Sequence, residues 1–137
     1  MVQAIKNLKK PVLGICVGMQ LITQHSEEGD ANLLAIIPLN TKLFNKDLGI
    51  KIPHMGWNNV ELKNNPLFEG VNLDTQFYFV HSYFIEYNPT FDIASVNYGN
   101  KFSAAIQKDN FYGVQFHPEK SGEAGERLLK NFSKLNS

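Results

Sequence analysis

Cys16 is the only cysteine of the chain, and it lies in the segment Gly14-Ile15-Cys16-Val17-Gly18. The pattern small-x-nucleophile-x-small after an apolar run is typical of a nucleophile elbow, here with cysteine in place of serine. Glycines two residues on either side permit a sharp strand-to-helix turn, which forces the central residue into a strained backbone conformation. The following helix would favour the thiolate and leave the Val17 N–H free for an oxyanion. Taken alone, the motif favours a buried structural cysteine.

A cysteine nucleophile needs a proton carrier and a group that orients it. Among the four histidines, His117 lies in GVQFHPEKSG with Glu119 two residues later, so both side chains would point to one side of an extended segment. The other three allow simpler interpretations. We expect His25 at a helix end, His54 in a surface or interface loop, and His81 at a strand end as a core residue or a site-lining group.

The elements that must position these residues alternate between helix and strand. Val2, Ile5 and Leu8 predict a helix that begins at Met1 and ends at Pro11, followed by a fully buried strand over 12–16. A helix over 18–25 and a strand over 33–39 come next. Further strands are expected at 58–62, 76–80, 84–87 and 92–99, then a hairpin of 102–107 with 111–116. A last helix should begin after an N-cap at Ser121, with the apolar stripe Ala124, Leu128, Leu129, Phe132 and Leu135. This order predicts an α/β architecture.

Composition excludes several functional classes. The 137 residues predict one domain over 1–137, and 13 basic against 13 acidic residues leave no net charge to attract nucleic acid or an anionic membrane. The apolar runs are too short to span a bilayer, and the N-terminal residues do not resemble a secretory signal. One cysteine rules out an internal disulfide, and no zinc-ligand spacing occurs. We therefore expect a cytoplasmic protein without a metal or cofactor.

LGICVGMQ at 13–20, together with QFHPEKSG at 115–122, resembles the triad-type, class I glutamine amidotransferases. Within them, PHMGWN at 53–58 and FVHSY at 79–83 are most similar to the glutaminase subunits of imidazole glycerol phosphate synthases. The similarity runs from about Lys10 to the C-terminus. It implies a flavodoxin-like three-layer α/β fold, with a mixed, mostly parallel sheet between helices.

The resemblance also assigns roles to individual residues. Cys16 would be the nucleophile, His117 the general acid and base, and Glu119 the orienting carboxylate. Substrate glutamine would be held by Val17, Gln20, Glu28, Ser82 and Tyr83. Released ammonia would pass to a (β/α)₈ synthase subunit, and the interface positions would be Pro53, His54, Met55, Gly56, Trp57, Asn58, Tyr78 and Lys120. Other interpretations remain for some of these: Gln20 on a helix surface, Glu28 in a solvated loop, and 53–58 as a packed loop anchored by Trp57.

Two departures from the family bear on activity. We expect the first strand–helix units of the family, and the glycine-rich loop that donates a second oxyanion N–H, to be missing. The isolated chain should then be poorly soluble and have little glutaminase activity, because one oxyanion donor accounts for about 10²–10³ in rate. The segment LLAIIPLNTKLF at 33–44 is less glycine-rich than usual in the family. This leaves open a paralogue that supplies a sugar-modifying amidotransferase. A separate alternative, from a different functional class, is an inactive remnant that only binds a partner.

Overall fold

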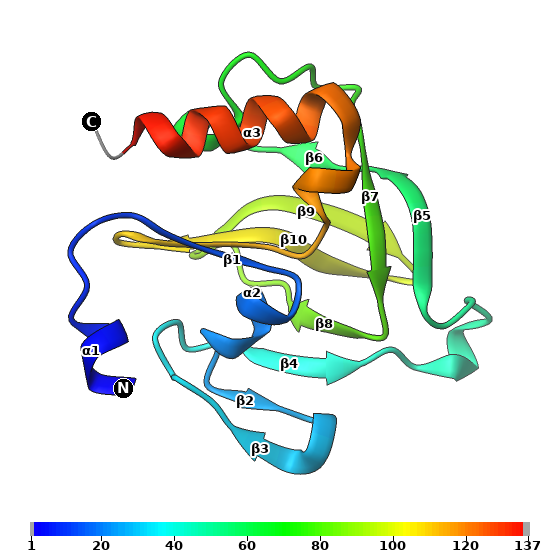
Figure 1. Cartoon of the computed structure of the whole chain (residues 1–137). Coiled ribbons are helices and arrows are strands. Elements are labelled where there is room, and N and C mark those ends of the chain that lie inside the picture. The colour runs from blue at the N-terminus through cyan, green and yellow to red at the C-terminus, as the bar shows by residue number, and fades with distance from the viewer. Residues whose placement is uncertain (1, 136–137) are drawn as a thin grey trace.

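The computed structural model describes residues 2–135, which form a curled mixed sheet with helices on both sides (Figure 1). The helices are α1 (Val2–Lys6), α2 (Val17–Leu21) and α3 (Gly122–Lys134), and short 3₁₀ turns are η1 (Glu28–Asp30), η2 (Lys46–Leu48), η3 (Pro66–Phe68) and η4 (Pro118–Lys120). The strands are β1 (Val12–Ile15), β2 (His25–Ser26), β3 (Ala31–Asn32), β4 (Asn40–Leu43), β5 (His54–Asn59), β6 (Glu61–Leu62), β7 (Gln76–His81), β8 (Tyr83–Glu86), β9 (Asp92–Tyr98), β10 (Asn100–Lys108) and β11 (Phe111–Val114).

The main sheet has the strand order β1-β11-β10-β8-β4-β2-β3, and β9 pairs with both β10 and β6. A second sheet consists of β5 and β7. Within residues 2–135 only the β1–β11 and β2–β4 pairs are parallel, and the other pairs are antiparallel. The expected mixed sheet is confirmed, but the expectation that it would be mostly parallel is wrong. Short connections account for the antiparallel pairs of consecutive strands, which are β2–β3, β9–β10 and β10–β11.

Two apolar clusters lie on opposite faces of β11 because successive side chains of a strand alternate between faces. Tyr112 and Val114 belong to the cluster that contains Leu128 of α3. Phe111 belongs to the other cluster, together with Met19 of α2. Figure 1 shows α3 above the strands β1 and β10, and α2 below them. The helix-sheet-helix arrangement agrees with the expected layers.

The segment after Cys16 differs from the expectation. Helix α2 ends at Leu21 rather than at residue 25, and His25 begins the short strand β2. Residues 33–39 form no strand. Their backbone instead wraps the end of α2, with the N–H groups of Ile36 and Ile37 both bonded to the Ile22 carbonyl. The apolar side chains of this run serve to pack against the core, so period and hydrophobicity alone misassigned it.

Three other expectations need correction. Helix α1 ends at Lys6, before Pro11, and its expected start at Met1 lies outside the described residues. Strand β1 is half-buried along its length, because within the described residues it pairs with β11 alone. In α3 the side chain of Leu129 is exposed, whereas the rest of the predicted stripe packs on the core.

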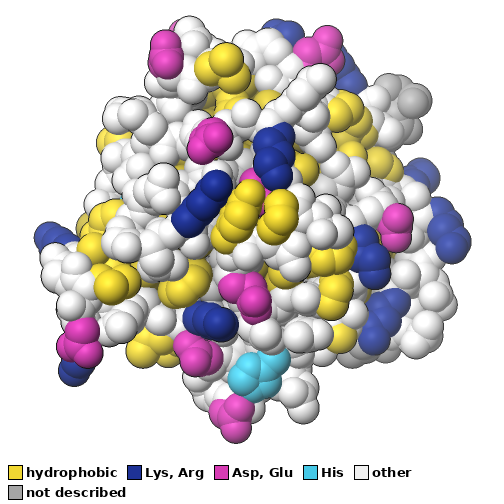
Figure 2. Space-filling model, turned by 180° about the vertical axis from the view of Figure 1, so that it is seen from behind, with side chains coloured by type: hydrophobic (Ala, Val, Ile, Leu, Met, Phe, Trp, Pro, Cys, Tyr) yellow, Lys and Arg dark blue, Asp and Glu magenta, His cyan; other side chains and the backbone are white. Residues whose placement is uncertain are grey.

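Other predicted elements are confirmed. Strands β7, β8 and β9 lie within a residue or two of the predicted positions, and β10 and β11 form the predicted antiparallel hairpin. On the face in Figure 2, acidic and basic side chains are intermingled, in agreement with the balanced charge. No helix among residues 2–135 is long and apolar enough to cross a membrane.

Candidate active site

Cys16 occupies the sharp turn between β1 and α2. Its backbone has φ 54° and ψ −107°, and its N–H donates to the Val114 carbonyl at 2.8 Å. This conformation is costly for a residue other than glycine, so the surrounding packing must maintain it. A Cβ on Gly14 would lie 2.5 Å from the Gly18 carbonyl oxygen, whereas a Cβ on Gly18 would meet no atom within 4 Å. The elbow is confirmed, but only the first of its two glycines is required by close packing.

The sulfur of Cys16 lies between two polar groups. Its thiol donates to the Val80 carbonyl at 3.9 Å, and Gln115 Nε2 donates to the sulfur at 3.6 Å. Burial raises the pKa of the Cys16 thiol, and the N–H groups of Val17 and Gln115 offset only part of that effect. The Val17 N–H at the turn favours the thiolate as expected, but the effect of burial on the thiol pKa is larger. Helix α2 has only five residues, and its dipole is correspondingly weak.

His117 and Glu119 form the expected pair. His117 Nδ1 lies 2.6 Å from Glu119 Oε1, an arrangement in which the carboxylate fixes the ring orientation. The backbone of His117 is held from two sides, because its N–H donates to the Tyr78 carbonyl and its carbonyl accepts from the Ser121 hydroxyl. The same hydroxyl accepts the Tyr78 N–H at 3.0 Å. Ser121 thus anchors the histidine segment to β7 and, contrary to expectation, does not cap α3 through its side chain.

Parallel pairing places the cysteine and the histidine at one end of the sheet. Gly14 and Ile15 of β1 pair with Gly113 and Val114 of β11, so Cys16 follows β1 where Gln115 and then His117 follow β11. Within the part of the chain that the structure describes, no hydrogen bond joins the sulfur to His117. Catalytic hydrogen bonds are often long without substrate and tighten in the complex. The arrangement is that of a cysteine and a Glu-oriented histidine on adjacent strand ends.

The residues expected to hold substrate differ in how they are connected to the site around Cys16. Gln20 lies one turn after Cys16, and its Nε2 donates to the Tyr83 carbonyl and to Gln115 Oε1, each at 3.2 Å. Ser82 lies between β7 and β8, where its carbonyl accepts the N–H of Phe44. Glu28 lies in η1, and its carboxylate makes no hydrogen bond or ion pair with any described residue. Gln20 thus links Tyr83 and Gln115 beside the cysteine, whereas no hydrogen bond or ion pair with a described residue ties the Glu28 carboxylate to them.

The segment 53–58 contributes an exposed face beside the cysteine. In β5 the side chains of Met55 and Trp57 are 58% and 53% exposed, and they pair in register with Val80 and Tyr78 of β7. The rings of Trp57 and Tyr78 meet edge to face at 5.8 Å. Because the Val80 carbonyl contacts the sulfur of Cys16, this apolar face of Met55, Trp57, Tyr78 and Val80 adjoins the cysteine.

His54 differs from the expectation for that segment. It is buried, so the proposal that it lies in a surface loop is wrong. Its Nδ1 lies 2.9 Å from Nε2 of His81, and His81 Nδ1 donates to the Tyr83 carbonyl at 2.7 Å. Burial lowers the pKa of both imidazoles, that of His81 to about 3. The two histidines are a neutral, hydrogen-bonded pair in the core.

Pro53 precedes β5, and Gly56 and Asn58 are partly buried within it. Lys120 is exposed in η4 next to Glu119. Gln115 contacts the sulfur directly and was not among the residues expected from the sequence. It lies two residues before His117, and the same alternation that paired His117 with Glu119 could have placed it on the site side.

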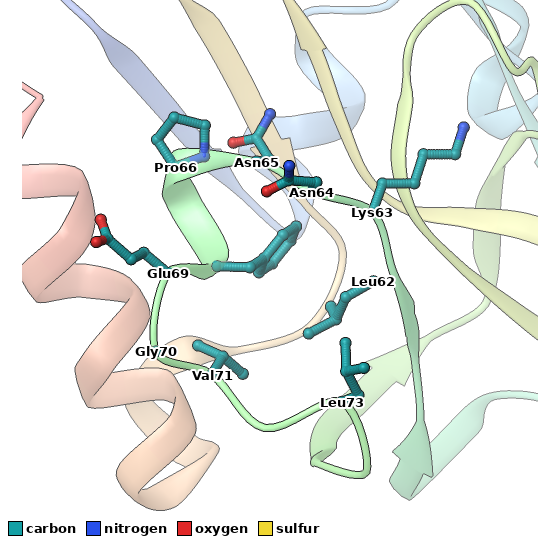
Figure 3. A pocket seen from close by; sticks show the side chains of 10 residues that line it. Leu62, Lys63, Asn64, Asn65, Pro66, Glu69, Gly70, Val71 and Leu73 are labelled. Carbon is teal, nitrogen blue, oxygen red and sulfur yellow. The ribbon is translucent and has the colours of Figure 1, made fainter.

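A separate groove lies beside η3, away from these residues. It is lined by residues 62–66, 68–71 and 73, and in Figure 3 Leu62, Val71 and Leu73 lie on one side of it and Asn64, Asn65 and Pro66 on the other. None of the residues expected to do chemistry lines this groove. Among the described residues, no group of three or more His, Cys, Asp or Glu side chains could hold a metal ion.

Comparison with known proteins agrees with this geometry. The sequence model of the family Glutamine amidotransferase class-I matches residues 1–135. The chain is 53% identical to the imidazole glycerol phosphate synthase subunit HisH of Haemophilus influenzae over 133 residues, and 51% identical to that of Bacteroides fragilis over 132 residues. These alignments cover 96% of this chain and 66% and 67% of the two relatives. The chain thus spans about two thirds of the length of the curated relatives that it matches.

Solved structures show the same fold at low sequence identity. One is that of a putative GMP synthase protein from Thermoplasma acidophilum. It has a TM-score of 0.72 at 21% identity, and the match covers 98% of this chain and 61% of that one. Another is a glutamine amidotransferase from Thermotoga maritima, with a TM-score of 0.61 at 16% identity, covering 97% of this chain and 51% of that one. The cysteine elbow, the His–Glu pair, the matched family model and these relatives together establish that the chain belongs to the class I glutamine amidotransferases.

Proposed function

We propose that the chain is the glutaminase part of an imidazole glycerol phosphate synthase, acting in histidine biosynthesis in the cytoplasm. Cys16 on its strained turn, next to the Glu119-oriented His117 at the end of the parallel neighbour strand, is the observation that carries the proposal. The similarity to HisH subunits over nearly the whole chain supports the same assignment.

The chemistry follows from the residues. Because burial raises the pKa of the Cys16 thiol, a base must remove its proton for attack at neutral pH. His117 donates from Nδ1 to Glu119 when neutral, which leaves the lone pair on Nε2 as the proton acceptor. The sulfur attacks the side-chain carboxamide of glutamine, and the protonated histidine gives its proton to the leaving ammonia. His117 then activates a water that hydrolyses the γ-glutamyl thioester to glutamate.

The oxyanion of each tetrahedral intermediate needs N–H donors. Val17 begins α2, so its N–H has no partner within the helix and faces the region of the sulfur. One such donor is typically responsible for about 10²–10³ of the rate. Gln20, Ser82 and Tyr83 are proposed to line the substrate site, and Glu28 is proposed as the acceptor for the ammonium group of the substrate.

Ammonia must reach its acceptor before solvent protonates it. We assign the apolar face of Met55, Trp57, Tyr78 and Val80 to the docking of a (β/α)₈ synthase subunit, with Lys120 at its margin. Two half-exposed large side chains beside the nucleophile support this, because interface cores favour aromatic residues and methionine. Pro53, Gly56 and Asn58 would then shape the face, and buried His54 would support it from behind.

The Cys16→Ala variant tests the proposal. We mix the purified chain with the synthase subunit of a HisH-containing enzyme, and measure synthase turnover with glutamine and, separately, with an ammonium salt. Turnover with glutamine should fall to background because the nucleophile is gone, while turnover with ammonium should persist. As a matched control, Ser82→Ala should retain the glutamine reaction in part. If Cys16→Ala changes neither reaction, the chain is a binding remnant and the proposal fails.

A further inference from the structure

Gln115 is a completely buried polar side chain that the proposed mechanism does not use. It follows β11 directly, and its backbone N–H donates to the Ala104 carbonyl at 2.7 Å. Its side chain makes two contacts, and each is with a residue of the candidate site. Nε2 donates to the sulfur of Cys16 at 3.6 Å, and Oε1 accepts from Gln20 Nε2 at 3.2 Å.

The direction of this amide can be deduced from a backbone carbonyl. The Tyr83 oxygen can only accept a hydrogen bond, so Gln20 must turn its NH₂ group toward it. The same NH₂ group then donates to Gln115 Oε1, which leaves the NH₂ group of Gln115 on the side of the sulfur. The hydrogen bonds that link the Tyr83 carbonyl, Gln20, Gln115 and the Cys16 sulfur are therefore compatible with only one orientation of the two amides. A reversed Gln115 would place its NH₂ group against that of Gln20 and a carbonyl oxygen against the sulfur.

The two neighbours of the sulfur act on different protonation states. The Val80 carbonyl can only accept, so it favours the protonated thiol. An amide N–H can only donate, and hydrogen bonds to an ionised acceptor are about twice as strong as those to a neutral one. The donor from Gln115 thus opposes the effects of burial and of the Val80 carbonyl.

We infer that Gln115 is a positioning residue, which holds the sulfur of Cys16 and favours its thiolate, and that Gln20 fixes the direction of the Gln115 amide. The inference rests on the proposed function in that it takes Cys16 as the nucleophile. It adds to the site a residue that acts through the cysteine rather than on substrate, and it gives Gln20 a role besides contact with glutamine.

The rate of Cys16 alkylation by iodoacetamide as a function of pH tests this in the full 137-residue chain. Cys16 is the only thiol, so the label reports on one site. Gln115→Met keeps the length of the side chain but removes its donors. We expect its alkylation midpoint to rise by about one pH unit, which corresponds to the loss of one hydrogen bond to a charged group. Alkylation below the midpoint should then slow about tenfold.

Gln107→Met is the matched control. Gln107 is also fully engaged, with Nε2 bonded to Asp109 and Tyr112 and Oε1 to Asn65, but it does not contact the sulfur. Its midpoint should equal that of the unmodified chain. Gln20→Met should show an intermediate rise, because Gln115 remains but its amide is no longer held in one direction.

An unchanged midpoint in a folded Gln115→Met chain, as judged by circular dichroism, would overturn the inference. If that variant does not fold, Gln20→Met decides the question in the same way. Because alkylation requires no glutamine, failure of the proposed glutaminase function can be distinguished from failure of the inference about Gln115. Glutamate release is measured separately, with the synthase subunit present: a shifted midpoint without any release there supports the role of Gln115 and contradicts the glutaminase. Glutamate release together with an unchanged midpoint supports the glutaminase and contradicts the role of Gln115.

Discussion

At the scale of single residues, the site combines groups whose charge states are set by burial. The His54–His81 pair lies beneath the apolar face of β5 and β7, and its second imidazole shares the Tyr83 carbonyl with Gln20. Burial is the main cause of the lowered pKa of His81, and the charge of a protonated His117 adds to it. The pair is therefore expected to stay neutral near pH 7.

Because His81 is neutral in the folded protein, the free energy of unfolding depends on pH. Burial lowers the folded-state pKa of His81 to about 3, whereas an unfolded histidine titrates near 6.5. Between these values the unfolded chain binds more protons, so the stabilisation is complete above about pH 6.5 and is lost as the pH falls. From pH 7.5 to pH 5.0 this group alone should lower the free energy of unfolding by about 2 kcal/mol.

Urea denaturation at the two pH values measures the effect. His81→Asn keeps a donor for the Tyr83 carbonyl but removes the titrating ring, so its free energy of unfolding should change less with pH by about that amount. The control is His25→Asn, which replaces a partly exposed histidine bonded to Asp30 and should behave like the unmodified chain. If the free energy of unfolding falls equally between pH 7.5 and pH 5.0 in the His81 variant and in the unmodified chain, the prediction is wrong.

At the scale of elements, the site depends on how closely β1 approaches α2. The turn at Cys16 brings the Gly18 carbonyl over Gly14, where even a methyl group has no room. The sequence pattern treats the two glycines alike, but the structure does not. This difference allows a test with two substitutions of the same kind.

Gly14→Ala should lower the free energy of unfolding by about 3 kcal/mol, because the added methyl meets backbone atoms that cannot move aside. Gly18→Ala should leave stability unchanged or raise it by up to about 1 kcal/mol, since the residue lies in a helix and the methyl would enter open space. Urea midpoints of the two variants provide the comparison. Equal destabilisation would mean that the turn is not as tight as described.

At the scale of the whole molecule, the apolar face of Met55, Trp57, Tyr78 and Val80 lies beside Cys16. Its members come from two strands of the separate β5–β7 sheet, and the same sheet anchors the histidine segment through Tyr78 and Ser121. A partner docked there would contact the element that holds both Cys16, through Val80, and His117. This placement supports assembly as part of the proposed function.

Trp57→Ala should weaken binding of the (β/α)₈ synthase subunit by about 2 kcal/mol or more, as is typical of an aromatic residue central to an interface. Titration calorimetry measures the change. Leu73→Ala is the control, because Leu73 is still more exposed, at 75%, but lies in the loop before β7, on the groove of Figure 3. If both variants bind alike, the docking face lies elsewhere.

Local chemistry in the sequence was enough to predict much of this protein. The glycine-flanked Cys16, the His117–Glu119 spacing and the hairpin of β10 with β11 all depend on residues close together along the chain, and the structure contains each of them. The family resemblance added the fold. The prediction failed at 33–39 and at His54, because pattern alone assigned side chains whose position is decided by long-range packing.

Only the tertiary structure determined which distant groups surround the sulfur. Val80 and Gln115 are 64 and 99 residues from Cys16 along the chain, and they reach it through the β1–β11 pairing and the neighbouring β7. The raised pKa of the Cys16 thiol has the same origin, because burial is a property of the packed molecule. The sequence by itself determined which side chains can attack, accept and orient. Long-range strand pairing determined their distances and charge states, since neither exists before the chain folds.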